Sequence, residues 1–334
     1  MLEPIALSIV GIVILIFGGD FLVRGASNLA YKMMISPLVV GLTVVAFGTS
    51  APELFISTWS ALSGHSNMAI GNVIGSNICN LSLVLGLTAM FYPILIKDNG
   101  IKFDWGLTIG SGLLLFSFIS WDNHLGMSEG VIMVVILLIY TYVLIQNSRK
   151  ANQKLAAEGI EIEHDEDVPD VSEINIWKEL AFFAAGIFGL WLGVKLFGES
   201  VVEIADHFGM DKAVAGLTVV AIATSLPELI TSVIAAYKKN TDLALGNLLG
   251  SCIFNVLSIL GITGIIKDID NIQTRILDFD MIWMFAGMLL LVPMIFIYRK
   301  FNFLSGLVLL LFYVAYTTIL ILRELHVEIM GMSI

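Results

Sequence analysis

The chain contains about ten apolar runs, most of them long enough to cross a lipid bilayer. A hydrocarbon core of about 30 Å is spanned by about 20 helical residues. We expect spans at residues 5–30, 37–62, 68–92, 104–121, 127–146, 177–202, 212–236, 242–266, 279–298 and 303–322. The runs are continuous, whereas a membrane β-barrel needs short segments of alternating polarity. With 57% hydrophobic and 13% charged residues, the chain is too apolar for a soluble domain of its size. We predict an all-α membrane protein with about ten transmembrane helices.

One segment of this chain recurs 175 positions later. GLTVVAFGTSAPELFIS (Gly41 to Ser57) and GLTVVAIATSLPELITS (Gly216 to Ser232) are identical at 12 of 17 positions. The same offset relates GNVIGSNICN (71–80) to GNLLGSCIFN (246–255). Because each half holds five predicted helices, an odd number, the second copy enters the bilayer from the opposite side. The sequence therefore predicts two inverted-topology five-helix repeats.

The boundaries of the repeats follow from the charges. We expect the first repeat at 1–147, an acidic linker at 148–175 and the second repeat at 176–334. Residues 156–175 contain eight acids and no Lys or Arg, which is typical of a solvated linker. A regulatory cation site there is an alternative, but the segment lacks the glycine-centred pattern of a calcium loop.

The basic residues predict the orientation. With the N-terminus outside, 12 of the 17 lysines and arginines fall on the inner side, as the positive-inside rule favours. We therefore expect a protein of the plasma or inner membrane. Both of its termini should face outward, and its acidic loop should lie in the cytoplasm. The first run lacks a basic start and a cleavage pattern, so we interpret it as a retained helix.

Other features exclude several classes of partner. Cys79 and Cys252 occupy non-corresponding positions of the repeat and fit no metal or disulfide pattern, so we expect both to be buried helix residues. The net charge of −11 is concentrated in the linker, and no basic stripe indicates nucleic acid. The sequence implies no cofactor and no protein partner beyond the lipid bilayer.

Two acids lie inside the apolar runs, one in each copy of the repeat. An ionised carboxylate at bilayer depth costs about 3 kcal/mol or more, so Glu53 and Glu228 indicate a functional site. The alternative is a protonated acid that a neighbouring helix satisfies.

Oxygen-bearing side chains accompany both acids. They are Thr49, Ser50, Ser76 and Asn80 in the first half and Thr224, Ser225, Ser251 and Asn255 in the second. Hard cations such as Ca²⁺ and Na⁺ prefer oxygen ligands. A single Ser or Thr in a membrane helix usually bonds to its own backbone, but the repetition favours an ion site.

Pro52 and Pro227 predict a break in each signature helix, because proline lacks the helical N–H and clashes with the carbonyl four residues earlier. Carbonyls near Ala46 to Thr49, and near Ala221 to Thr224, would then be free to face an ion. We also expect Gly71, Gly75, Gly246 and Gly250 to hold the second and third helices of each half close together.

The paired signatures GTSAPE with GSNICN, and ATSLPE with GSCIFN, resemble the two alpha repeats of the cation/calcium exchanger superfamily, most closely its sodium/calcium antiporter branch. The resemblance covers essentially the whole chain. It implies alternating access, in which Ca²⁺ leaves the cell and Na⁺ enters through overlapping sites at the membrane midplane. It also implies that helices 1 and 6, each with several glycines, slide across the rest as a gating pair. Core packing without motion is an equally good interpretation of those glycines.

The same resemblance implies a set of ligands. Calcium would be held by the carboxylates of Glu53 and Glu228 and the backbone oxygens of Thr49 and Thr224. The sodium sites would add Ser50, Ser76, Ser225 and Ser251 and the carbonyls of Ala46 and Ala221, with Asn80 as a central amide. Sodium-coupled members often carry Asp where this chain has Asn255, which leaves two acids instead of three and leaves the stoichiometry open.

Two carboxylates give the site a charge of about −2, which one Ca²⁺ or two Na⁺ would neutralise. We therefore expect exchange by mutual exclusion. A proton-coupled Ca²⁺ antiporter of the same superfamily is the main alternative, with H⁺ as the coupling ion. A passive channel is less favoured, because a two-fold inverted repeat is typical of carriers. An enzyme is not expected, since none of the five histidines lies in an HExxH motif.

Overall fold

The computed structural model describes residues 2–96, 100–157, 174–207 and 221–324, and most of these residues are helical. In the labels, α marks α-helices and η marks π-helical segments. The first half contains α1 (Leu2–Lys32), α2 (Pro37–Val40), η1 (Gly41–Val45), α3 (Ala46–Thr49), α4 (Ala51–Leu62), α5 (Ser66–Cys79), η2 (Asn80–Val84), α6 (Leu85–Phe91), α7 (Ile101–Asp122) and α8 (Met127–Ala157). The second contains α9 (Ile176–His207), α11 (Ala221–Thr224), α12 (Leu226–Tyr237), α13 (Thr241–Phe254), η4 (Asn255–Leu260), α14 (Gly261–Ile266), η5 (Ile276–Asp280), α15 (Met281–Val292), η6 (Pro293–Tyr298) and α16 (Phe303–Glu324).

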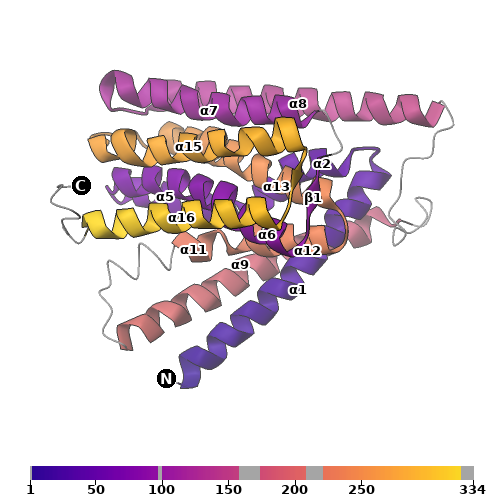
Figure 1. The fold of residues 1–334 in the computed structure, drawn as a ribbon, viewed down its shortest axis with the longest axis horizontal. Coiled ribbons are helices and arrows are strands. Elements are labelled where there is room, and N and C mark those ends of the chain that lie inside the picture. The colour runs from indigo at the N-terminus through magenta and orange to yellow at the C-terminus, as the bar shows by residue number, and fades with distance from the viewer. Residues whose placement is uncertain (1, 97–99, 158–173, 208–220, 325–334) are drawn as a thin grey trace.

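These helices confirm the predicted membrane fold. In the described ranges, eight helical spans are long and apolar enough to cross a membrane, and the bent pair Pro37–Thr49 and Ala51–Leu62 adds a ninth. The predicted span at 212–236 lies partly outside the described residues and is seen from Ala221 onward, as α11 and α12. The start of α1 and the end of α16 lie at the same end of the molecule (Figure 1).

The structure differs from the expected boundaries in two places. Helix α8 continues to Ala157, so residues 148–157, which we assigned to the linker, extend this helix, and residues 158–173 lie outside the described part. The chain is also not wholly helical, because β1 (Ile94–Leu95) pairs with β2 (Lys300–Phe301) in an antiparallel ladder. This ladder lies at the end of the molecule beyond which α8 projects (Figure 1).

The inverted repeat is visible in backbone pairs that occur at both ends of the helices. In the strand ladder, Ile94 lies opposite Phe301. An isolated bridge pairs Leu125 with Ile269. Ile269 is 175 positions after Ile94, and Phe301 is 176 positions after Leu125, so the two pairings are copies of one another. Because α7 runs between residues 94 and 125, the copies lie at opposite ends of the bundle.

A pair of buried acid–tyrosine contacts follows the same repeat. The Tyr140 hydroxyl donates to Asp104 Oδ1 at 2.9 Å, and the Tyr316 hydroxyl donates to Asp280 Oδ1 at 3.1 Å. Each acid is 36 residues from its tyrosine. These hydrogen bonds satisfy acids that would otherwise be costly at membrane depth. They join α7 to α8 and η5 to α16.

The centre of the bundle is formed by the third helix of each half. The continuous spans Ser66–Phe91 and Thr241–Ile266 are far more buried than the other long helices. Figure 1 shows α5 and α13 in the interior, with α7 and α8 on one side and α1 and α9 on the opposite side. The signature segments, which precede α5 and α13 in the chain, therefore meet near the middle.

Helices α1 and α9 form a close pair that crosses the bundle diagonally (Figure 1). Glycines occur every seven residues at their contact: Gly11, Gly18 and Gly25 on α1, and Gly186 and Gly193 on α9. A Cβ atom at Gly18 would lie 2.8 Å from the backbone N of Leu190, so only glycine permits this approach. The glycines therefore set the distance between these two helices.

The glycines of the third helices act differently from our expectation. Gly246 and Gly250 pack on the second helix of the opposite half, where a Cβ at Gly250 would lie 2.7 Å from Leu42 Cα. Within the described part of the chain, nothing lies within 4 Å of a Cβ at Gly71 or Gly75. The close contacts at Gly246 and Gly250 thus link the two halves, and these glycines do not hold the second and third helices of one half together.

We predict that Gly18→Leu separates α1 from α9 and lowers stability by about 1–3 kcal/mol, because the obstructing atoms belong to the backbone and cannot move aside. Thermal unfolding in detergent, with Gly106→Leu as the control, measures the effect. A Cβ at Gly106 meets no atom within 4 Å of the described chain. Equal stabilities for the two variants would contradict the predicted contact.

Candidate functional site

The second helix of the first half is broken at Ser50. Helix α3 ends at Thr49, α4 begins at Ala51, and the two segments are bent by 47°. The cause is Pro52, which has no N–H to donate to the carbonyl of Gly48. Ser225 interrupts the second copy with nearly the same backbone angles, φ −86° and ψ 3° against φ −83° and ψ 6° at Ser50. The expected break is therefore present in both halves.

Each break is followed at once by an acid. Glu53 lies in the first turn of α4 and Glu228 in the first turn of α12, and both side chains are fully buried. The carboxylates thus sit at positive helix N-terminal ends, which stabilise negative charge. The segments before the breaks end there with carbonyl groups, which attract a cation. A break of this kind supplies both fixed charge and backbone oxygens at one depth.

Glu228 is held by hydroxyls from two other helices. Its Oε1 accepts from Ser50 Oγ at 3.1 Å and from Ser251 Oγ at 3.4 Å. Ser50 belongs to the first half and Ser251 to the second, so the acid joins the two repeats. Its other oxygen, Oε2, has no hydrogen-bond partner among the described residues.

Glu53 is less satisfied than its copy. Neither of its carboxylate oxygens has a hydrogen-bond partner within the described ranges. The two carboxylates also repel one another electrostatically. Burying two like charges with free oxygens is strongly unfavourable unless a positive charge compensates them. The arrangement therefore fits a positively charged ligand.

The amides of Asn80 and Asn255 lie at corresponding places on the third helices. Asn80 begins the π-helical segment η2 and Asn255 begins η4, and both side chains are fully buried. Single π-helical turns occur frequently at functional sites. Both amide atoms of Asn80 and the Oδ1 of Asn255 are without a partner in the described chain. The two amide oxygens are therefore further potential ligands for a cation.

Thr49 contacts the opposite half through its hydroxyl. Thr49 Oγ1 lies 3.2 Å from Asn247 Oδ1 and 3.4 Å from Ser251 Oγ. It also lies 3.3 Å from the carbonyl oxygen of Ala46, which already accepts from the backbone N–H of Ser50. The Ala46 carbonyl is therefore engaged within its own helix.

Three more of the predicted residues lie in the interior. Thr224, Ser225 and Ser76 are buried, and Ala221 begins α11, although its side chain is not described. Among the described residues, the Ser225 hydroxyl has no hydrogen-bond partner. Cys79 and Cys252 are free and buried, as we expected.

Sequence reasoning missed three asparagines that support the site. Asn247 Nδ2 donates to Ser232 Oγ at 3.1 Å, and its repeat copy Asn72 donates to Ser57 Oγ at 2.9 Å. Asn77 bonds to the backbone of Cys252 and to Asn255. The signal for the first two was the Gly–Asn pair present in both copies of the repeat, at 71–72 and 246–247.

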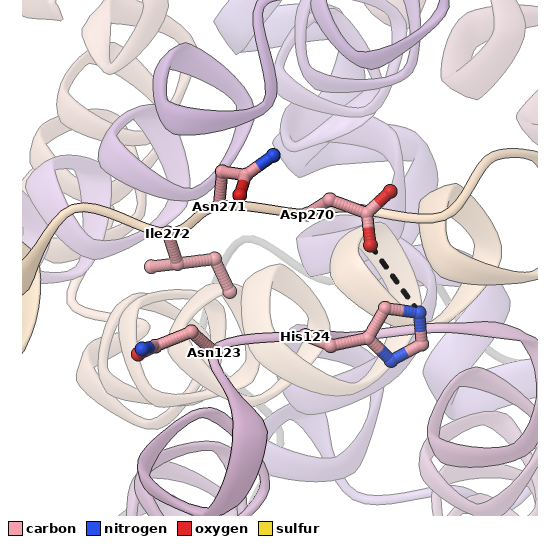
Figure 2. Close-up of a pocket in the computed structure, with 5 residues that line it drawn as sticks. All are labelled: Asn123, His124, Asp270, Asn271 and Ile272. Atoms are coloured by element: carbon pink, nitrogen blue, oxygen red, sulfur yellow. Dashed lines mark ion pairs between the residues drawn. The ribbon is translucent and has the colours of Figure 1, made fainter.

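A polar depression of about 530 Å³ has neither glutamate in its lining (Figure 2). It is lined by Asn123, His124, Asp270, Asn271 and Ile272, and His124 Nε2 lies 3.6 Å from Asp270 Oδ1. These loops carry the Leu125–Ile269 bridge, so the depression lies where the repeat copies the strand ladder. The contact between His124 and Asp270 joins two loops across that end of the bundle.

Comparison with known proteins agrees with this geometry. The family model described as "Sodium/calcium exchanger protein" matches residues 3–146 and 178–322. Among similar proteins, the "Putative antiporter CaxA" of Alkalimonas amylolytica is 34% identical, over 96% of this chain and 99% of that protein. The "Sodium/calcium exchanger MaX1" of Methanosarcina acetivorans is 33% identical, over 93% and 97%.

The fold is similar to solved structures as well. A structure of the sodium-calcium exchanger NCX_Mj, soaked with Na⁺ and Sr²⁺, matches with a TM-score of 0.79 and 26% identity over 95% of this chain and 98% of that one. The family resemblance inferred from the two signature pairs is thereby confirmed. The chain is an integral membrane protein that belongs to the sodium/calcium exchanger family.

Proposed function

We propose that this protein is a secondary-active antiporter, and not an enzyme, that exchanges intracellular Ca²⁺ for extracellular Na⁺ by alternating access. The observation that carries the proposal is a pair of buried carboxylates, Glu53 and Glu228, with three oxygens unpartnered among the described residues. Neutral oxygens from both halves accompany them. A cation bound there removes the repulsion and supplies the missing partner.

The ligands follow from the chemistry of the two ions. Ca²⁺ is bound by the carboxylates of Glu53 and Glu228 and by backbone oxygens of Thr49 and Thr224. Na⁺ uses an overlapping set, which adds the hydroxyls of Ser50, Ser76, Ser225 and Ser251 and the carbonyls of Ala46 and Ala221, the Ala46 oxygen through its second lone pair. The amide oxygens of Asn80 and Asn255 serve both ions. Both ions prefer oxygen, and Ca²⁺ accepts six to eight such ligands. The hydrogen bonds of Ser50 and Ser251 to Glu228 support this shared use.

Charge balance explains how one ion replaces the other. The two carboxylates need about two positive charges, which either one Ca²⁺ or two Na⁺ provide. An empty site retains a charge that resists movement through a medium of low dielectric constant. Exchange is then obligatory, because the protein changes conformation only when the glutamates are neutralised.

The pair of helices α1 and α9 is the proposed moving element. The glycine contact, in which Gly18 approaches the backbone of Leu190, holds the two helices close enough to move as one unit. A mostly apolar crevice of about 330 Å³ lies between α9 and the two breaks, and Pro52, Pro227 and Trp191 border it. Displacement of α9 over this crevice changes access to the buried acids. In the proposed orientation, the basic end of α8 and the acidic loop are cytoplasmic and both termini face outward.

We predict that Glu53→Gln and Glu228→Gln each weaken Ca²⁺ binding at least about a hundredfold, because removing one charged partner from a buried site costs about 3–5 kcal/mol. Equilibrium binding of radioactive Ca²⁺ to detergent-purified protein measures this loss. Asp278→Asn is the matched control, since Asp278 is an exposed carboxylate. Unchanged Ca²⁺ transport in either glutamine variant would overturn the proposed site.

The coupling ion is tested with imposed gradients. In proteoliposomes loaded with Na⁺ and diluted into Na⁺-free buffer containing Ca²⁺, we expect rapid Ca²⁺ uptake with no pH difference across the membrane. A pH gradient alone should drive no uptake above that of protein-free vesicles. The reverse pattern would identify the proton-coupled alternative, and uptake without any gradient would indicate a channel.

The charge of the site also predicts the electrical behaviour. Exchange of one Ca²⁺ for two Na⁺ moves no net charge, so we expect no steady current from proteoliposomes on a solid-supported membrane after a Ca²⁺ concentration jump. A clear current whose reversal potential fits three Na⁺ per Ca²⁺ would contradict the assignment of two charges to the site.

A further inference from the structure

Asn77 is a fully buried residue of α5 that lies one turn before Asn80. Its Nδ2 donates to the backbone carbonyl of Cys252 at 3.2 Å, and the same nitrogen lies 3.9 Å from Met284 Sδ. A carbonyl oxygen only accepts hydrogen bonds, so the carboxamide of Asn77 cannot turn over without placing two oxygens against each other. The backbone of the opposite repeat thus fixes which way Asn77 faces.

This fixed orientation is passed to Asn255. Asn77 Oδ1 accepts from Asn255 Nδ2 at 3.0 Å. With its nitrogen engaged, Asn255 is left with Oδ1 as its available atom, and this oxygen is buried without a partner in the described part of the chain. Asn255 begins η4, which packs against α4, the helix that carries Glu53. A carboxamide has an attractive and a repulsive end for a cation, so its orientation decides whether it is a ligand.

The repeat does not provide the same arrangement for Asn80. The position that corresponds to Asn77 in the second half is Cys252, whose short thiol cannot replace a carboxamide. Both amide atoms of Asn80 accordingly lack a partner among the described residues. The two amides are therefore unequal, and only Asn255 is held in advance with its oxygen free.

We propose that Asn77 is a positioning residue that fixes the Asn255 carboxamide with its oxygen toward the transported cation. The inference rests on the proposed function, and it assigns a role to a residue outside the set of proposed ligands. Without Asn77, the Asn255 amide can rotate and present its NH₂ group to the ion. Residues that orient a metal ligand typically change metal affinity by about 10- to 100-fold when they are removed.

A double-mutant cycle tests this role on the full-length protein in detergent. Radioactive Ca²⁺ binding is measured for Asn77→Ala, Asn255→Ala and the double variant. We expect Asn77→Ala to weaken Ca²⁺ binding about tenfold, and the double variant to bind no more weakly than Asn255→Ala alone. Asn67→Ala is the control, because Asn67 is an amide of α5 that bonds to the loop at Asn271 and Gln273. It should bind Ca²⁺ as the unmodified protein does.

A second background separates positioning from a general effect on folding. In Asn255→Asp, both oxygens of the new carboxylate are equivalent acceptors, so orientation by Asn77 becomes unnecessary. We expect Asn77→Ala to have less than a twofold effect on Ca²⁺ affinity in this background. Should Asn77→Ala fail to give monodisperse protein, Asn77→Ser replaces it in the same cycle, since its hydroxyl is too short to reach Asn255 in the same geometry.

Each outcome has one meaning. Losses that multiply in the double variant, or a tenfold loss that persists with Asp at 255, would show a structural role for Asn77 and overturn the inference. Glu53→Gln measured beside them reports on the site itself. If that variant loses Ca²⁺ binding while the cycle shows no coupling, the inference fails and the proposed function stands. If Glu53→Gln binds Ca²⁺ normally, the proposed function is wrong, and the inference that rests on it is wrong as well.

Discussion

The structure depends on the placement of two carboxylates, Glu53 and Glu228, in an interior that cannot solvate them. At this depth a charge is tolerated only with a compensating partner. The chain provides neutral oxygens and helix N-termini around the pair, which lower the cost without cancelling the charge. Such a pair is complementary to a cation, which is why we propose it as the transport site at the two helix breaks.

The inverted repeat builds this site by exchanging contacts between its halves. Ser50 reaches Glu228, Thr49 reaches Asn247, and Gly250 packs on Leu42. The outer helices are connected by a repeated acid–tyrosine pair and by repeated backbone bridges at the two ends. A frame made in this way holds the proposed ligands in place, while the glycine contact joins α1 and α9 as a close pair.

Much of the fold could be predicted because each helix carries its own signal. Apolar length marked the spans, and Pro52 and Pro227 marked the breaks to within two residues. The glycines were harder to interpret, since their sequence spacing shows a small helix face but not the helix it meets. Gly246 and Gly250 proved to contact the opposite half. The role of Asn77 could not be predicted, because its partner Cys252 lies 175 residues away in the chain.

By itself the sequence determined a helical membrane protein with two related halves and a buried acid in each. These properties follow from the apolar composition, from the repeat along the chain and from the cost of burying a carboxylate. None of the three depends on how the helices pack against one another. Only the tertiary structure decided which oxygens are already engaged and which remain free. The carbonyl oxygen of Ala46 and the Nδ2 of Asn255 already make hydrogen bonds within the protein. Both oxygens of Glu53 and the Oδ1 of Asn255 have no partner in the described chain. That difference arises from distances of about 3 Å between helices, which the order of residues along the chain does not record.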